Sequence, residues 1–306
     1  MQPTPQEAPQ LRPLGVGDIV DRVFALYRSR PLLLLAVAAV PYLLLFLLIT
    51  GIAVAFAATY VAVLGPLTQI ANDPTNPNVN LPALAGALGG VLVTVAFIVI
   101  AAVVILSAQS AALIAAMSAL YLKRTITAGQ VFNEGLRASP RIIGASLAVF
   151  LLVMALWVVL AIAMVVANQG LAVALGILFG LVATVYIFAS TLVTPVVATL
   201  EGLGPIAAIR RSFRLSTGNR WRIIGLQLLL LVLNAVIGAL LSAIFLGSFI
   251  NDVTTRTIVQ QVANLLTNVA WAPVQWGTFA ILYYDLRVRH EAFDLQLAAE
   301  SLPRPS

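Results

Sequence analysis

The side chains with the greatest capacity for chemistry in this sequence of 306 residues gather in two short segments. The first segment, residues 205–222, is basic, and its candidate surface consists of Arg210, Arg211, Arg214, Arg220, Trp221 and Arg222. Arginines beside a membrane attract anionic lipid headgroups at roughly 1 kcal/mol each, so this surface could bind lipid headgroups or a protein partner. The simpler interpretation, which needs the same residues, is that these arginines only orient a membrane protein.

The second segment is LYYDLRVRHEAFDL, residues 282–295, in which aromatic and charged side chains alternate closely. Its boundary cluster consists of Tyr283, Tyr284, Asp285 and Arg287. The tyrosines are typical of a membrane–water interface, and Asp285 could pair with Arg287, with Arg289 or with an earlier arginine. A catalytic site would need a second placed acid, a nucleophile with its base, or metal ligands, and this segment offers none of them. We therefore predict no enzymatic activity, no catalytic residue, no metal site and no cofactor.

The composition indicates a lipid bilayer as the surroundings of the chain. Hydrophobic residues make up 61% of the sequence and charged residues 9%, against roughly 25% charged residues in soluble domains. The absence of cysteine excludes disulfides and thiolate chemistry, and the single histidine, His290, excludes a multi-histidine metal site.

Long apolar runs predict six transmembrane helices, because about 20 helical residues cross the ~30 Å hydrocarbon core of a bilayer. These spans cover about residues 31–64, 83–121, 140–167, 171–199, 221–248 and 257–286. No glycine or proline turn divides the long second run. A serine cap followed by a first-turn proline, Ser139–Pro140, predicts that the third span begins there. We expect residues 1–13 to form a disordered tail, 14–290 to form the membrane domain, and 291–306 to form a second tail.

The positions of the basic residues predict the orientation of these spans. Sixteen of the 17 lysines and arginines fall on one side of the predicted spans, and only Arg256 falls on the other. Basic residues mark the cytoplasmic side, so both termini are expected in the cytoplasm. The same sorting explains the net charge of +6 without nucleic acid as a partner. Because arginine greatly outnumbers lysine, a high-GC bacterial genome is indicated, and we expect a bacterial plasma membrane.

Three amphipathic segments precede the outward-running spans and predict interfacial helices on the cytoplasmic side. They lie at residues 18–30, 127–141 and 205–217, and Gly218 suits the C′ position of the third. The strings RIIGASL and RIIGLQL then begin the third and fifth spans. The predicted fold is therefore an all-α, polytopic membrane bundle with a pseudo-repeat of one interfacial helix plus one transmembrane hairpin.

Polar residues within the spans are amides rather than charged groups. Every Asp, Glu, Lys and Arg falls at a boundary, in a loop or in a tail, which argues against an ion-coupled transporter. The amides that stand out are Gln109 and, in spans 5 and 6, Gln227, Asn234, Asn268 and Gln275. Such amides bond across helices for about 0.6–2 kcal/mol, which is the preferred interpretation. The alternative is that those of spans 5 and 6 line a polar groove.

Three stretches together resemble a known family. LRPLGVGDIVDRVFALYRSRP, IRRSFRLSTGNRWRIIGL and ILYYDLRVRHEAFDL are similar to bacterial proteins of the glycerophosphoryl diester phosphodiesterase membrane-domain family. The resemblance implies a six-span membrane domain associated with glycerophosphodiester or lipid metabolism. The catalytic phosphodiesterase barrel of such proteins is a separate domain of about 200 or more residues, and nothing in this sequence resembles it.

These observations predict a non-enzymatic, multi-pass membrane protein. It would act as a scaffold or accessory subunit, or interact with lipids through its basic surface. Anionic headgroups are the expected partners, together with a possible protein partner on the cytoplasmic face. The alternatives are a permease-like subunit for an apolar or amphipathic substrate, and a membrane domain associated with lipid metabolism.

Overall fold

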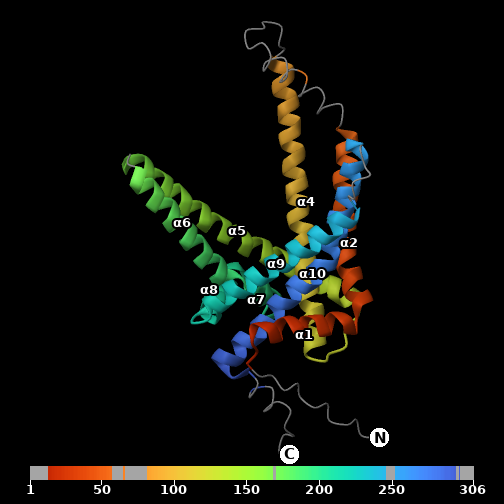
Figure 1. Cartoon of the computed structure of the whole chain (residues 1–306), viewed down its shortest axis with the longest axis vertical. Coiled ribbons are helices and arrows are strands. Elements are labelled where there is room, and N and C mark those ends of the chain that lie inside the picture. Colours follow the sequence, from red (N-terminus) through yellow and green to blue (C-terminus); the bar gives the residue numbers. More distant parts are fainter. Residues whose placement is uncertain are drawn as a thin grey trace, which may run out of the picture. The chain divides into compact units, whose positions relative to one another are not determined.

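The regular structure of the chain is helical throughout the part described by the computed structural model, which confirms the all-α prediction. The described residues are 13–56, 65, 81–167, 170–245, 252–293 and 296. Their helices are α1 (Val16–Ser29), α2 (Pro31–Ala55), α4 (Leu81–Tyr121), α5 (Ala128–Ala167), α6 (Gly170–Thr191), α7 (Thr194–Leu200), α8 (Pro205–Ser216), α9 (Arg220–Phe245) and α10 (Val253–Glu291) (Figure 1).

Five helical stretches are long and apolar enough to cross a membrane, by length and composition. They are Pro31–Ile52, Leu84–Tyr121, Ala128–Ala167, Gly170–Leu200 and Arg220–Ile244. Large apolar side chains remain exposed along these helices, as expected for surfaces that face acyl chains rather than water. The five stretches fit a helical membrane protein and coincide with the first five predicted spans.

Helix α10 coincides with the predicted sixth span but is not among these five stretches. Amides such as Gln260, Asn264 and Asn268 lower the hydropathy of its first half. Its second half, from Trp271 to Leu286, is mostly buried within the protein. The sixth crossing therefore stays a prediction.

The chain divides into two compact units, and each is described by itself. The first unit comprises Met1–Ala38 and Ser107–Ser306, and the second comprises Ala39–Leu106. The core of the first unit contains Ala111–Met117 of α4, the second half of α10, and Ile19 of α1. Close approach of α4 and α10 depends on Gly277, where a Cβ would lie 2.6 Å from Cε of Met117. The described part of the second unit consists of the later turns of α2 and the earlier turns of α4.

Helix α5 contradicts the helix start that the sequence predicts at Ser139–Pro140. The helix begins at Ala128 and continues through Pro140 to Ala167, so the second amphipathic segment is part of the same helix. Pro140 removes one helical hydrogen bond, the one to the carbonyl of Leu136. Tight packing of the preceding turn on α4 offsets this cost, since a Cβ at Gly135 would lie 2.5 Å from the carbonyl oxygen of Ala108. Packing therefore outweighed the local start signal.

The predicted fourth span is interrupted near its end. Helix α6 ends at Thr191 and α7 begins at Thr194, with Pro195 in the first turn of α7. A proline at this position cannot donate to the carbonyl of Thr191, and it disfavours helical backbone in the residue before it. The break redirects the chain toward α8.

Helices α5 and α6 lie side by side as an antiparallel pair (Figure 1). A Cβ at Gly176 would lie 2.9 Å from Met164, and one at Gly180 would lie 2.9 Å from Leu160. The two glycines therefore permit close packing within the chain. The indole N–H of Trp157 on α5 donates to the Thr184 hydroxyl on α6 at 3.1 Å, which adds a polar link to the pair.

Several predicted features lie outside the described residues. They are most of the N-terminal tail (1–12), the end of span 1 (57–64), most of the following loop (66–80), the turn at 168–169, residues 246–251, and most of the C-terminal tail (294–295 and 297–306).

Candidate functional site

The basic segment folds as the sequence predicts locally. Pro205 lies in the first turn of α8, and Gly218 has a φ of +77° directly after the helix, in the left-handed region that favours glycine. Helix α8 buries its serine face: the hydroxyls of Ser212 and Ser216 both donate to the carbonyl of Ser190, at 2.8 and 3.4 Å. This contact attaches α8 to the end of α6.

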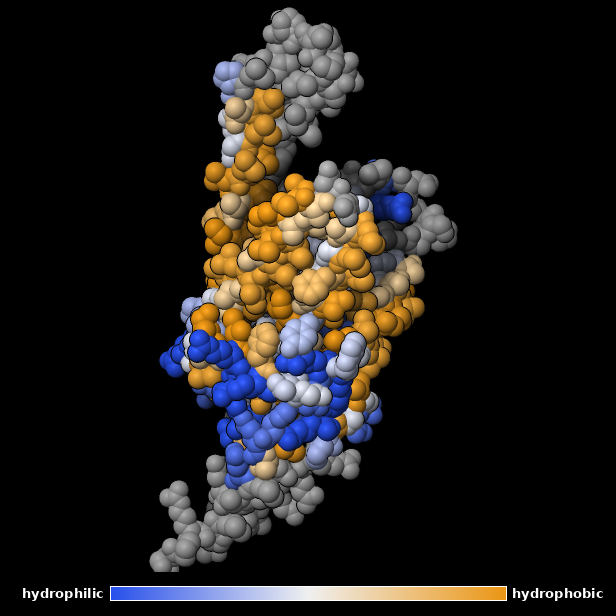
Figure 2. All heavy atoms as spheres, turned by 90° about the vertical axis from the view of Figure 1, so that its left-hand side faces the viewer, coloured by the Kyte–Doolittle hydropathy of each residue, from blue (hydrophilic) through white to orange (hydrophobic). Residues whose placement is uncertain are grey.

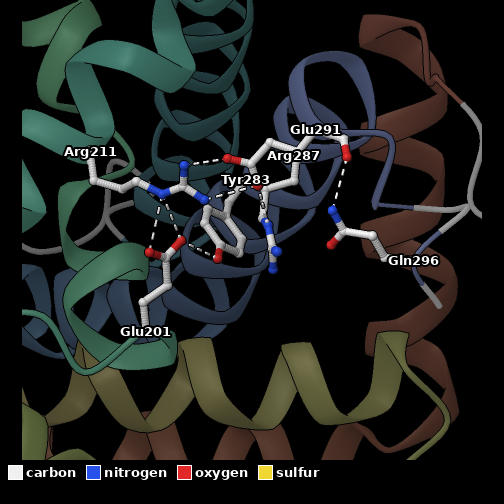
Figure 3. Close-up of polar contacts among 6 residues, drawn as sticks. All are labelled: Glu201, Arg211, Tyr283, Arg287, Glu291 and Gln296. Carbon is white, nitrogen blue, oxygen red and sulfur yellow. Dashed lines mark hydrogen bonds and ion pairs between the residues drawn. The ribbon is translucent and has the colours of Figure 1, made fainter. Parts of the chain in front are cut away.

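One cluster of ion pairs joins α8 to α10, and we call it the Glu291 network (Figure 3). Nε of Arg211 donates to both carboxylate oxygens of Glu201 at 3.1 Å, and its terminal nitrogens donate to Glu291, one of them at 2.9 Å. Arg287 donates to Glu291 at 2.9 Å, and the Tyr283 hydroxyl donates to Glu201 at 2.7 Å. The network thus connects the residue after α7 with α8 and the last turns of α10.

Electrostatics in this network favour the charged forms of Arg211 and Glu291. Hydrogen bonds from Arg211, and secondarily from Arg287, hold the pKa of the Glu291 carboxyl below its ordinary value. The hydrogen bond to Glu291 raises the pKa of Arg211 in return. Both groups lie outside the predicted spans. The arginine is therefore permanently charged and its charge is neutralised within the protein.

A second cluster surrounds the buried carboxylate of Asp285, and we call it the Asp285 centre. Asp285 is 2% exposed and accepts the backbone N–H of Leu14 at 2.7 Å. Arg222 and Arg289 both pair with its other oxygen, Arg289 at 2.9 Å. The same two arginines donate to the carbonyl of Leu14. The chain before α1 is thus held by both of its main-chain groups at Leu14 against α9 and α10.

The pairing of Asp285 agrees with two of the partners that the sequence allows. Arg289, four residues later, lies on the same face of α10 and pairs with it, and Arg222 is the earlier arginine. Arg287 pairs with Glu291, again four residues away, rather than with Asp285. Helical spacing explains why Arg289 and not Arg287 pairs with Asp285, since residues two apart point to different sides of a helix.

The structure divides the predicted basic surface, apart from Arg220, into two sets. Arg211 and Arg222 are held in ion pairs. Arg210 and Arg214 are exposed and have no acidic partner among the described residues, and Trp221 is 87% exposed. Figure 2, which looks at the side where α5, α6 and α8 lie, shows hydrophilic residues gathered in a band below a broad apolar surface.

Arg220 differs from both sets. Its Nε donates to the Ser190 hydroxyl at 2.9 Å, and its guanidinium lies 4.5 Å from the ring centre of Tyr186. A cation over an aromatic face within about 6 Å is attracted by the ring. Arg220 is therefore held in place by neutral groups.

The tyrosines of the boundary cluster are buried in the protein. Tyr283 is 1% and Tyr284 5% exposed, and Tyr284 packs against the rings of Tyr121 and Phe293. Their contacts are with the chain itself in the described structure.

The amides of spans 5 and 6 differ in their exposure and in their partners. Asn234 and Asn268 are exposed, and Asn268 donates to the carbonyl of Asn264 in its own helix at 2.8 Å. Gln275 is half-buried, and Oε1 of Gln227 is buried without a hydrogen-bond partner among the described residues. The expected bond across helices is confirmed for Gln109, which donates to the carbonyl of Ala38 at 2.8 Å.

Sequence reasoning missed Leu14, Glu201, Glu291 and Tyr186. The spacing of four between Arg287 and Glu291 is a signal that could have found that pair. The role of Leu14 depends on main-chain groups, which carry no sequence signal. Within the described residues no group of three or more potential metal ligands comes together.

No family model, curated protein or solved structure matches the chain. The geometry at the basic end is therefore the basis for the functional argument.

Proposed function

We propose that this chain is a multi-pass membrane protein of a bacterial plasma membrane whose cytoplasmic end interacts with anionic phospholipids. The observation that carries the proposal is the presence of exposed cations beside neutralised ones. Arg210 and Arg214 are exposed without an acidic partner among the described residues, whereas Arg211 between them in the sequence is bound by two glutamates. Anionic headgroups would supply the missing negative charge at roughly 1 kcal/mol for each arginine.

The proposed topology has six spans with both termini in the cytoplasm. Its support is the sorting of basic residues along α10: Arg256 lies in the first turn, and Arg287 and Arg289 lie near the end of the helix. At 1.5 Å per residue, Arg256 and Arg287 are roughly 46 Å apart along the helix, more than the hydrocarbon thickness of ~30 Å. Helix α1 would then lie at the interface, since it buries Ile19 and Val23 and exposes Asp21 and Arg28.

The topology can be tested directly because the chain contains no cysteine. Single cysteines would be introduced as Gln169→Cys and Thr217→Cys, and a membrane-impermeant maleimide would be applied to intact cells. We expect labelling of the first variant in intact cells and of the second only after permeabilisation. The native chain is the blank. The reverse pattern of labelling would overturn the orientation.

The lipid interaction can be measured with spin-labelled lipids on the reconstituted protein. We expect phosphatidylglycerol to associate more strongly than phosphatidylcholine, and the preference to weaken at high salt as exposed charges are screened. Arg210→Gln combined with Arg214→Gln removes about 2 kcal/mol of attraction, roughly thirtyfold in association with the sites concerned.

The matched control is Arg256→Gln, which removes one exposed arginine from the first turn of α10. This variant should keep the preference for phosphatidylglycerol at the basic end. Equal association of the two lipids with the native chain would contradict the proposed function.

A further inference from the structure

An apolar groove runs between α6 and the first turn of α9. It has a volume of about 450 Å³, which lies in the range of about 300–1,000 Å³ found for small-molecule sites. Leu181, Val182 and Val185 form its wall on α6, and Ile224 faces them from α9. On α6, Leu181 and Val185 are four residues apart, as are Val182 and Tyr186, so the four side chains share one face of the helix. The wall is thus a continuous apolar strip with one aromatic ring at its end.

A cation closes this end of the groove. Tyr186 and Arg220 both line it, and the ring of Tyr186 together with the Ser190 hydroxyl holds the guanidinium in a defined place. Only Nε of Arg220 is used in a hydrogen bond within the described structure. The two terminal nitrogens, with four N–H groups between them, form the planar fork that matches the oxygens of a phosphate.

The surroundings of Arg220 distinguish it from the paired arginines nearby. Arg211 and Arg222 meet carboxylates, and no carboxylate pairs with Arg220 among the described residues. An anion bound from outside would complete its coordination. The apolar wall beside it indicates that this anion carries a hydrocarbon chain.

We propose that this groove binds one anionic phospholipid, with its phosphate on the terminal N–H groups of Arg220 and one acyl chain along the wall of α6. The proposal rests on the proposed function, since it assigns a defined site to the lipids that the basic end attracts. Val182 is 61% and Leu181 52% exposed, so the wall is continuous with the exposed apolar surface of α6, from which an acyl chain would enter. Trp221, 87% exposed beside Arg220, lies at the rim as an aromatic ring at headgroup level does.

The site predicts one lipid that binds more tightly than those that follow. Native mass spectrometry of the delipidated full chain in detergent, titrated with phosphatidylglycerol, counts each bound lipid. Arg220→Gln should weaken the first binding step about tenfold, because a charge-assisted, two-pronged contact to phosphate is lost. Arg256→Gln is the matched control, because it removes the same charge from the first turn of α10, outside the groove.

A second variant tests the groove without changing charge. Val182→Trp fills the apolar wall and should also weaken the first step about tenfold or more, whereas Val173→Trp, elsewhere on α6, should leave it unchanged. Each variant is first shown to elute as one species in size-exclusion chromatography. Its unfolding temperature in phosphatidylcholine micelles should equal that of the native chain.

Three results would overturn the site: equal first-step binding of phosphatidylcholine, an unchanged first step in both groove variants, or displacement of the lipid by equimolar inorganic phosphate. The last result would identify a phosphate site that needs no acyl chain. If only the Arg210 and Arg214 double variant loses lipid preference, the proposed function stands and the groove fails. If the groove binds its lipid but spin-labelled lipids show no preference in the native chain, the groove stands and the proposed function fails.

Discussion

Arg210 and Arg211 are neighbours in the sequence and differ completely in their surroundings. Arg211 bonds to two glutamates and connects three elements of the fold, whereas Arg210 is exposed and bonds to neither of these acids. Successive residues of a helix point about 100° apart, so α8 directs one side chain inward and the next outward. A count of basic residues by side of the membrane treats the two as equal. Their surroundings show that Arg210 is available to an outside partner, whereas Arg211 is occupied by partners within the chain.

The comparison extends to the roles that each set can perform. The paired set, Arg211, Arg222, Arg287 and Arg289, joins segments far apart in the sequence, including Leu14 and α10. The exposed set, Arg210 and Arg214, joins no segments in the described structure. Loss of a paired arginine should therefore affect stability, and loss of an exposed arginine should affect only interactions with lipids.

The largest expected effect is at the Asp285 centre. Asp285→Asn keeps the size of the side chain but removes the charge that neutralises Arg222 and Arg289. Breaking a buried ion pair by removing one partner costs about 3–5 kcal/mol. Equilibrium unfolding in mixed micelles should show a loss of this order in the free energy of unfolding.

Asp21→Asn is the control for this substitution, because Asp21 is an exposed acid on α1. Its change should stay within about 0.5 kcal/mol of the native protein. If the two variants were equally stable, the Asp285 centre would not hold the fold together, and the distinction between the two sets of arginines would lose its main support.

The second test compares the neighbours themselves. Arg211→Gln removes the contacts to Glu201 and Glu291 and should lower the free energy of unfolding by about 1.5–3 kcal/mol, the usual value for hydrogen bonds to charged groups. Arg210→Gln should change it by less than about 0.5 kcal/mol. Equilibrium unfolding of the two variants measures this difference. Equal losses in the free energy of unfolding would show that the exposure of an arginine does not predict its contribution to stability.

Some of this organisation could be predicted from the sequence and some could not. Hydropathy located the long apolar helices, and helical spacing allowed the pair of Asp285 with Arg289. The predicted start of α5 was wrong because the local signal at Pro140 is weaker than the packing of Gly135 against α4. Local patterns report on a helix and its surface, but they contain no information about which distant backbone it will meet.

The candidate site shows the same limit. The sequence predicted one basic surface of six residues, but it did not predict that some would be paired, some exposed, and Arg220 held by neutral groups. That division depends on Glu201, Glu291 and Leu14, which reach the arginines only through the tertiary fold. Tyr186, which positions Arg220, lies on a different helix and has no spacing relation to it.

The smallest expected effect is the dependence of the Glu291 network on pH. Arg211 and Arg287 lower the pKa of Glu291 below its ordinary value of about 4.5. A group with a lowered pKa in the folded state stabilises that state fully above its ordinary pKa and loses this contribution as the pH falls through the lower value. The unfolding temperature should therefore fall as the pH drops below the ordinary carboxyl pKa of about 4.5, and the fall should be shallower in Glu291→Gln.

Glu134→Gln, which alters an exposed acid on α5, should leave the slope of the native protein unchanged. The effect should be smaller than that of Arg211→Gln, because protonation weakens the contacts to one carboxylate and leaves those to Glu201 in place. The four curves of unfolding temperature against pH, for the native chain and for the variants at Glu291, Glu134 and Arg211, separate these cases. A slope that is the same in Glu291→Gln and the native chain would mean that other carboxylates control acid stability and that this pair contributes nothing measurable to it.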